Sequence, residues 1–421
     1  MKIFFPLILV YVVLVLFFAP NELIWDEHRY MGNAENILKG QFIEEDLDIR
    51  NGPGYPLFLA PFTRVGLPLM GLRLLNVGLM IGFLFFSYST LRIYVNERAA
   101  IIATYLLGLY PEALRWVVML YSETLSIFLV SGFMYFLVVF IREKEFKVKS
   151  GLLAAFFFAF LALTKLIFAQ VLTTCLIAGV IGSVLGRKSF YKRSLLVATT
   201  AYVLCVPYLI YTFSYTGKFP LWGTNGGEQL YWMTSPYEGE MGDWMSWTEV
   251  LQKEVPELHP SHYEFYTSVE SLNGIERNDA FVQKGIENFK EHPQEYLYNW
   301  IANMGRFLFH YPYSFRNQTL NTYVILVPNM VLIFSILLAA VGIFKGYRDV
   351  PTEFWLLLFW ALVYFGGSSL VHAETRYFWM VVPTCILWVS WTFSKKFRVA
   401  LLPVEGVREE KEGLVSIVES P

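Results

Sequence analysis

The chain has 421 residues, of which 55% are hydrophobic and 16% are charged. A charged share of about 25% is typical of soluble globular domains, so this composition argues against a soluble protein. The formal net charge of −2 supplies no basic field, which excludes proteins that bind nucleic acid through a basic surface. Composition therefore indicates a membrane protein without a nucleic-acid partner.

Apolar segments of membrane-spanning length recur along the chain. We expect about ten spans of 15–25 residues, because a helix needs about 20 apolar residues to cross the hydrocarbon core. The first segment ends in Ala19-Pro20-Asn21, which is not a clear small-x-small cleavage site, so we interpret it as a retained anchor. The expected spans are 3–19, 70–91, 99–116, 124–141, 150–164, 167–185, 194–213, 322–344, 353–370 and 377–394.

The segments 150–164 and 167–185 are predicted to form a hairpin. As one helix they would be roughly 50 Å long, whereas the hydrocarbon core is about 30 Å thick. Lys165 interrupts the apolar run, which places it at the tip. With this hairpin, the short loops on one side are consistently basic, as the positive-inside rule expects of cytoplasmic loops. We therefore predict a multi-pass protein of the plasma (cell) membrane with both termini cytoplasmic.

Two long loops fall on the outer side. The first, about 20–69, is net acidic and begins with Trp25-Asp26-Glu27, where two adjacent carboxylates follow directly on a membrane span. It ends in Arg50-Asn51-Gly52-Pro53-Gly54-Tyr55, whose density of Pro and Gly predicts a tight turn. The second loop, 214–321, is expected to form a small, partly helical module. Its amphipathic stretch, 279–309, is broken at His292-Pro293.

These loops divide the chain into four parts. The N-terminal membrane module, 1–213, contains the first outer loop. The extracytoplasmic loop module, 214–321, precedes the C-terminal membrane helices, 322–398, and a cytoplasmic tail, 399–421. The three cysteines lie in apolar segments and show neither a disulfide framework nor a metal-binding spacing.

Ionisable residues gather at the outer ends of the expected spans. Carboxylates there can take a proton from an acceptor hydroxyl or amine. Lysine and arginine can hold a phosphate and neutralise the charge that develops as it leaves. The candidates are Asp26 and Glu27 as catalytic acids or bases, Glu123 as a further acidic group, Lys165, Arg376 and Arg50 for a phosphate, and Tyr55, Glu374 and Tyr377 as orienting groups.

Structural roles compete with each of these assignments. Acidic residues favour the first turn of a helix, which would account for Asp26 and Glu27 and for Glu123. Lys165 and Arg376 could anchor at the membrane interface by snorkelling to the headgroups. No cofactor is firmly predicted, and a divalent metal is compatible with the carboxylates but not indicated, since no histidine pair has a partnering ligand motif.

Five short motifs in this order resemble the GT-C superfamily of membrane glycosyltransferases, in particular the family of protein O-mannosyltransferases and the lipid A aminoarabinose transferase. The resemblance runs from the N-terminus to about residue 395 and implies an all-α, multi-pass, GT-C-like fold. The motifs are Trp25-Asp26-Glu27 with Tyr30, Gly52-Pro53-Gly54-Tyr55-Pro56-Leu57-Phe58-Leu59, Ser122-Glu123-Thr124-Leu125, Leu163-Thr164-Lys165, and Glu374-Thr375-Arg376-Tyr377 with Pro383.

The resemblance also implies a function. It places the catalytic base on Asp26, the second acidic position on Glu123 and donor-phosphate binding on Lys165. Relatives often read Arg/Lys-Pro-Pro where this chain reads Arg50-Asn51-Gly52-Pro53, so Asn51 stands at the usual position of the cation. The implied reaction is inverting transfer of a sugar from a polyprenyl-phosphate carrier to a protein, lipid or glycan acceptor at the outer face of the membrane.

Three other functions remain open from the sequence. A transporter or flippase of lipid-linked sugars would show internal repeats and charged or broken helices at the midplane, and neither is evident. A non-catalytic scaffold or receptor on the same frame would not need the acid pair at Asp26 and Glu27. A GT-C-type polymerase or ligase of surface polysaccharide is the alternative that the sequence distinguishes least well from a glycosyltransferase of this family.

Overall fold

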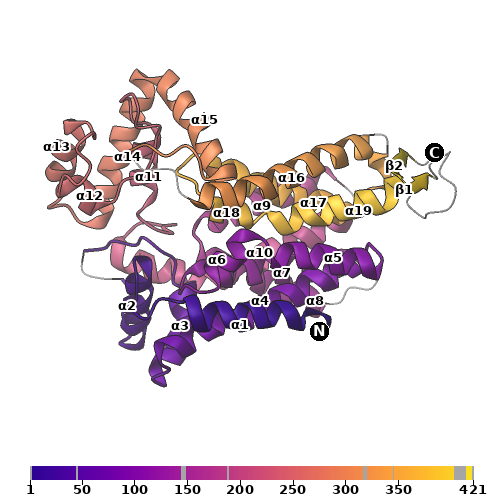
Figure 1. The fold of residues 1–421 in the computed structure, drawn as a ribbon. Helices are drawn as coiled ribbons and strands as arrows, with labels where there is room; N and C mark the ends of the chain where they lie inside the picture. Colours follow the sequence, from indigo (N-terminus) through magenta and orange to yellow (C-terminus); the bar gives the residue numbers. More distant parts are fainter. Residues whose placement is uncertain are drawn as a thin grey trace.

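The computed structural model describes residues 2–43, 46–143, 148–186, 189–315, 320–344, 346–402 and 414–419. Long helices lie side by side in an elongated bundle, and shorter helices gather at one end of it (Figure 1). The start of α1 (Phe5–Phe18) and the end of α19 (Val382–Lys396) both lie at the other end. The two long outer loops form these shorter helices. They lie at the same end of the bundle, as expected of two loops on one side of a membrane.

The bundle is built from apolar helices. Besides α1 and α19, its elements are η1 (Lys2–Phe4), α4 (Leu69–Arg92), α5 (Glu97–Gly108), α6 (Pro111–Trp116), α7 (Ser122–Arg142), α8 (Val148–Thr164), α9 (Ile167–Leu185), α10 (Ser189–Thr216), α16 (Leu320–Phe344), η2 (Tyr347–Asp349), α17 (Thr352–Ser369) and α18 (Thr375–Trp379).

Five helices among the described residues are long and apolar enough to cross a membrane, namely α4, α7, α9, α10 and α16. The shorter helices α1 and α8 are also apolar. The predicted hairpin is confirmed, because α8 ends at Thr164 and α9 begins at Ile167 with Lys165 between them. The expected count of about ten spans is not confirmed.

Two expected spans are interrupted, and proline explains where. The segment 99–116 divides into α5 and α6, because Pro111 has no backbone N–H to continue a helix and its ring disfavours helical backbone at the preceding residue. The segment 377–394 divides in the same way into α18 and α19, and Pro383 lies in the first turn of α19. These breaks leave short helices at the end of the bundle that carries the outer loops.

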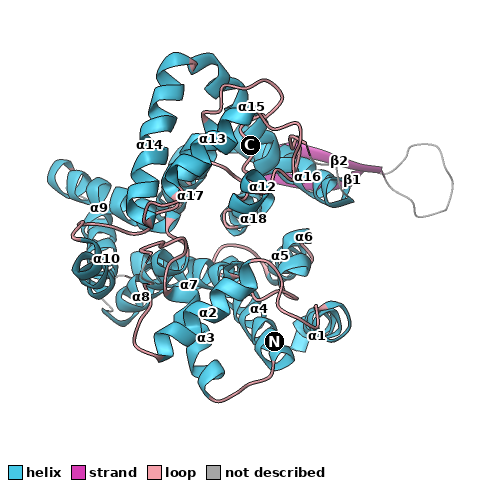
Figure 2. Cartoon of the chain, turned by 90° about the vertical axis from the view of Figure 1, so that its left-hand side faces the viewer, coloured by secondary structure: helices cyan, strands magenta, loops and turns pink. Residues whose placement is uncertain are grey.

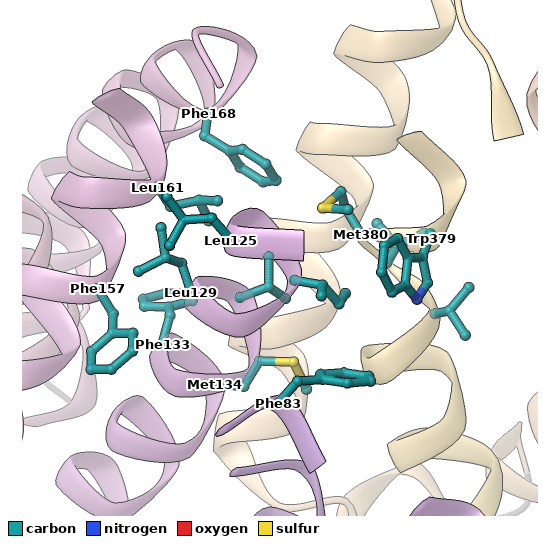
Figure 3. Close-up of a cluster of buried hydrophobic side chains, with 14 of the residues drawn as sticks. Phe83, Leu125, Leu129, Phe133, Met134, Phe157, Leu161, Phe168, Trp379 and Met380 are labelled. Carbon is teal, nitrogen blue, oxygen red and sulfur yellow. The ribbon is translucent and has the colours of Figure 1, made fainter. Parts of the chain in front are cut away.

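Helix α7 lies at the centre of the bundle. Within its most apolar window 72% of the residues are buried, compared with 22% for α16. Its side chains Leu125, Leu129 and Phe133 belong to one buried cluster with side chains from α4, α8, α9 and α18 (Figure 3). Because α7 is surrounded by protein, a polar residue in its first turn faces other helices and not lipid.

The first outer loop forms α2 (Asp26–Leu38) and α3 (Gly54–Arg64). The second forms α11 (Gly226–Met233), α12 (Trp247–Leu251), α13 (Pro260–Val269), α14 (Gly274–Glu291) and α15 (Pro293–Phe309). Seen from this end of the bundle, α2 and α3 lie over the ends of α4, α7 and α8, and the second set lies beside them (Figure 2). The predicted break at His292-Pro293 is confirmed as the boundary between α14 and α15.

The second outer loop has a hydrophobic core of its own, separate from that of the helix bundle. Trp232, Tyr266 and Phe281 are buried against one another from α11, α13 and α14. It is joined to the first loop by backbone hydrogen bonds from Thr224 to Ile49 and from Gly274 to Asp46, of 2.9 and 2.6 Å.

The C-terminal region adds an element that the all-α prediction did not include. Strand β1 (Phe397–Leu402) follows α19 directly and pairs antiparallel with β2 (Leu414–Glu419), with Phe397 opposite Glu419. Together they form a two-stranded hairpin at the end of the bundle away from the outer loops.

Candidate active site

Helix α2 separates its two adjacent carboxylates. Successive residues on a helix point about 100° apart, so only one of the pair can face the protein interior. Glu27 is that residue: it is fully buried, its Oε2 lies 2.7 Å from Arg73 Nη2, and its Oε1 accepts a 2.7 Å hydrogen bond from Leu120 N. Asp26 instead keeps 35% of its side chain exposed and pairs with Arg29 at 2.8 Å.

Glu27 therefore anchors α2 to the bundle. We predicted that Asp26 and Glu27 act together as acid and base, but the structure turns their carboxylates to different surroundings. Arg73, which lies in α4, also donates hydrogen bonds to the backbone carbonyls of Pro20 and Glu22 and so holds the chain that precedes α2. Sequence analysis missed Arg73, although an ionisable residue inside an apolar span is itself a signal of a polar site.

Lys165 and Arg376 converge on Glu123. Glu123 lies in the first turn of α7, and its Oε1 is 2.8 Å from Lys165 Nζ and 3.6 Å from Arg376 Nε. The Glu123 side chain is 2% exposed, whereas those of Lys165 and Arg376 are 11% and 16% exposed. Three residues that are far apart in sequence therefore form one charged cluster, in which the two cations keep more exposed surface than the carboxylate.

Glycines hold the tip of the α8–α9 hairpin in place. A Cβ on Gly52 would lie 2.0 Å from the carbonyl oxygen of Leu163, and one on Gly54 would lie 2.4 Å from Thr164 Oγ1. The first outer loop thus packs its backbone directly against the residues that precede Lys165. This contact gives a physical reason for the Gly-Pro-Gly turn predicted from the sequence.

Lys165 itself lies in a low-dielectric environment. Burial lowers the pKa of its ammonium group, and Arg376 lowers it further, while Glu123 acts in the opposite direction. Its Nζ also lies 5.1 Å from the centre of the Tyr377 ring. The ammonium is therefore held in a site where any second anion would interact with it strongly.

Arg376 is surrounded by aromatic rings and has a second carboxylate partner. Its Nε lies 3.0 Å from Glu374 Oε2, and its Cζ lies between 5.3 and 5.9 Å from the rings of Trp116, Tyr121 and Tyr377. Burial would raise the pKa of Glu374, but Arg376 and His372 outweigh it and hold the pKa well below its usual value. Glu374 is therefore a fixed negative charge that orients the guanidinium.

Tyr121 connects Asp26 to this cluster. The backbone N–H of Asp26 donates a 3.3 Å hydrogen bond to the Tyr121 hydroxyl, and the ring of Tyr121 lies against Arg376. Burial, followed by the Asp26 carboxylate, raises the pKa of Tyr121 well above its usual value, so it remains a neutral group between the two charges. Tyr121 precedes the Ser122-Glu123 motif but was not among the sequence candidates.

A second connection runs through Tyr30. Its hydroxyl donates a 3.2 Å hydrogen bond to Ser122 Oγ, which in turn lies 3.5 Å from Glu123 Oε2. Tyr55, expected to orient the substrate, lies behind Tyr30 with the ring centres 5.0 Å apart and is fully buried. Tyr55 therefore supports the wall of the site and does not line it.

Arg50 is not part of this cluster. It pairs with Asp48 at 2.8 Å and with Glu228 of α11 at 3.6 Å, and Arg277 of α14 also contacts Asp48, at 3.0 Å. Burial would lower the pKa of Arg50, but Glu228 and Asp48 outweigh it and raise it. These contacts join the two outer loops, so the donor-phosphate role expected for Arg50 does not match its position.

Asn51, which precedes the Gly-Pro-Gly turn, lies beside Arg29 of α2. With its amide oxygen turned inward, Asn51 lies 2.6 Å from Arg29 Nε, and the same guanidinium contacts Asp26. Asp26 and Arg29 meet because residues three positions apart are neighbours on the surface of a helix, here α2. Among the described residues, no group of three or more His, Cys, Asp or Glu side chains is arranged to hold a metal ion.

No model of a known protein family and no curated protein matches the chain. Among solved structures, the Archaeoglobus fulgidus oligosaccharyltransferase AglB, in complex with an inhibitory peptide and a dolichol-phosphate, matches with a TM-score of 0.51 and 13% identity over 93% of this chain and 50% of that chain. The Archaeoglobus fulgidus oligosaccharyltransferase tethered with an acceptor peptide gives a TM-score of 0.51 at 12% identity, over 93% and 49%. ArnT from Cupriavidus metallidurans bound to undecaprenyl phosphate gives 0.43 at 14% identity, over 94% and 77%.

The chain spans about half the length of the oligosaccharyltransferases that it matches. At this identity the similarity concerns the fold. It confirms the all-helical, GT-C-like fold that the resemblance implies, because 93% of this chain aligns with the fold of the oligosaccharyltransferase.

Proposed function

We propose that this chain is a glycosyltransferase that moves a sugar from a polyprenyl-phosphate carrier to an acceptor, with inversion at the anomeric carbon. The observation that carries the proposal is the convergence of Lys165 and Arg376 on Glu123, beside Tyr121, whose hydroxyl accepts a hydrogen bond from the backbone N–H of Asp26. The fold supports it, because the similar oligosaccharyltransferase AglB has been solved with a dolichol-phosphate.

Each charged group has a chemical task in this reaction. Asp26 accepts the proton of the acceptor hydroxyl or amine while the acceptor atom forms a bond to the anomeric carbon. The bond between that carbon and the phosphate oxygen breaks, and its electron pair leaves with the polyprenyl phosphate. Lys165 and Arg376 stabilise the negative charge that develops on the leaving phosphate. The reaction needs no nucleotide, since the phosphate is itself the leaving group.

The position of the site suits a lipid-linked donor. Lys165 lies at the tip of a hairpin of apolar helices, so a polyprenyl tail can stay in the bilayer while the phosphate reaches the cations. We infer that this end of the bundle faces the extracytoplasmic side of the plasma (cell) membrane and that both termini are cytoplasmic. The transferred unit is a hexose or a pentose, and the acceptor is a protein, a lipid or a glycan.

Replacement of Asp26 by Asn tests the proposal most directly. In proteoliposomes supplied with a radiolabelled polyprenyl-phosphate sugar and membrane acceptors, we expect transfer to fall by about 10²–10⁴-fold, the usual contribution of a general base. Binding of the donor and the unfolding temperature should be unchanged. Asp349→Asn is the matched control, because Asp349 is exposed and pairs with Lys396, the last residue of α19. Transfer at the wild-type rate by Asp26→Asn would exclude Asp26 as the base.

The same assay separates transfer from transport. A transferase releases polyprenyl phosphate without its sugar, whereas a flippase moves the carrier with the bond intact. Mass spectrometry of the lipid fraction distinguishes these products, and a ladder of lengthened glycans would identify a polymerase. Accumulation of one polyprenyl-phosphate sugar in cells that lack the protein would identify the donor.

A further inference from the structure

The cations that would bind the donor phosphate already have anionic partners. Lys165 is paired with Glu123, and Arg376 is shared between Glu123 and Glu374. Two positive charges are thus balanced by two carboxylates within one cluster. A phosphate that approached this neutral cluster would gain attraction from the cations but would be repelled by Glu123 at close range.

The pair of Glu27 with Arg73 in the same protein shows what a sealed structural ion pair looks like. Both side chains are 0% exposed, and Glu27 accepts additional hydrogen bonds from Leu120 N and Ile24 N at 2.7 and 3.0 Å. Glu123 differs, because its cation partners keep exposed surface and its contact to Arg376, at 3.6 Å, is longer than a hydrogen bond. The cluster around Glu123 is therefore open to exchange of one anion for another.

We propose that Glu123 is an internal counter-ion that occupies the anion position between Lys165 and Arg376, and that the donor phosphate binds by taking these cations from it. The inference rests on the proposed function and assigns Glu123 a regulatory part in it instead of acid/base chemistry. When the polyprenyl phosphate product leaves, the carboxylate pairs with the cations again. Glu123 thereby weakens binding of the donor and of the product alike and promotes product release.

Neutralising Glu123 should consequently tighten phosphate binding. Removal of one negative charge at this distance from two cations, in a buried site, is expected to lower the dissociation constant for undecaprenyl phosphate by about tenfold or more, since charge pairs interact strongly in such surroundings. Glu123→Gln preserves the size of the side chain and an oxygen that can accept from Lys165. The product should become a correspondingly stronger inhibitor of transfer.

The experiment is a titration of the purified full-length protein in nanodiscs with undecaprenyl phosphate and, separately, with inorganic phosphate. Glu123→Gln should bind undecaprenyl phosphate more tightly than wild type, and Lys165→Met should bind it more weakly. If inorganic phosphate responds in the same way, the headgroup alone is recognised; if only the lipid responds, the tail is required for entry. Glu374→Gln is the matched control, because Glu374 has no direct contact with Lys165, and its effect should be the smaller of the two.

Equal or weaker binding by a folded Glu123→Gln protein would overturn the proposal, and Glu374→Gln binding as tightly as Glu123→Gln would reduce it to a net-charge effect and overturn it as well. If Glu123→Gln does not fold, Glu123→Asp provides the test, because its shorter side chain withdraws the carboxylate from Lys165. That variant should bind a few-fold more tightly, and unchanged or weaker binding would count against the counter-ion role. Failure of the wild-type protein to bind undecaprenyl phosphate would instead contradict the proposed function.

Discussion

Replacing Gly52 with alanine tests whether the first outer loop positions Lys165. The added Cβ would lie 2.0 Å from the carbonyl oxygen of Leu163, whereas real Cβ atoms essentially never approach such an atom closer than 3.0 Å. The loop or the hairpin tip must therefore move by about 1 Å, and overpacking of this kind usually costs about 1–3 kcal/mol of stability. Lys165 is only two residues beyond Leu163, so the shift reaches the cation that contacts Glu123.

A displacement of about 1 Å at a positioning group can lower a catalysed rate by about 10²-fold. We expect Gly52→Ala to lose transfer activity and donor affinity on this scale while the helices remain folded. Donor binding by titration, transfer in proteoliposomes and the unfolding temperature should be measured together. Gly32→Ala is the matched control, because Gly32 lies in α2 with nothing within 4 Å of the added Cβ. It should raise helix stability slightly and leave transfer unchanged.

The reasoning would be refuted if Gly52→Ala kept the donor affinity and rate of the wild-type protein. It would also be refuted if both glycine variants lost activity equally, because the close approach to Leu163 would then not be the cause. If Gly52→Ala lost activity but kept its donor affinity, the loop would not act through Lys165, and the positioning role would be contradicted.

Three further predictions concern the charged groups. Lys165→Ala should weaken donor binding more than acceptor binding, and equal donor affinity in a titration would contradict this. Glu27→Gln should lower the free energy of unfolding by about 3–5 kcal/mol, because it leaves the buried Arg73 unpaired, and joint replacement of both by apolar residues should restore part of it in denaturant unfolding. The pKa of Glu374 is lowered in the folded state, so its contribution to stability is present at neutral pH and is lost as the pH falls below the unfolded value near 4.5. The unfolding temperatures of wild type and Glu374→Gln should therefore converge in acid, and a constant difference down to the lowest pH would contradict the assignment.

Several features were predicted from local sequence, because short-range rules determine them. The lengths of apolar segments located α4, α7, α9, α10 and α16, and the excessive length of 150–185 located the hairpin with Lys165 at its tip. The same local pattern failed at 99–116, where the apolar run continues but helix α5 ends at Gly108 and Pro111 begins the separate helix α6. Hydropathy reports burial in a membrane or core and does not report whether the backbone can continue.

The site shows where sequence stops being informative. Asp26 and Glu27 are adjacent and chemically equivalent, and only the docking of α2 on Arg73 buries one and leaves the other open. Arg50 immediately precedes the predicted turn. Its side chain pairs with Glu228, which lies more than a hundred residues further along the chain, so the local sequence does not reveal its partner. Tyr121 joins the site by accepting a hydrogen bond from the backbone N–H of Asp26. A motif of side chains gives no indication of such a contact.

By itself the sequence determined that this is a helical membrane protein whose ionisable residues collect at the ends of its apolar segments, because helix length, hydropathy and charge are properties of neighbouring residues. Only the tertiary structure decided that Glu123, Lys165 and Arg376 share one cluster while Arg50 and Glu27 belong elsewhere. The physical reason is that charges interact over a few ångströms of space, and the packing of distant helices around α7 sets which side chains come within that range.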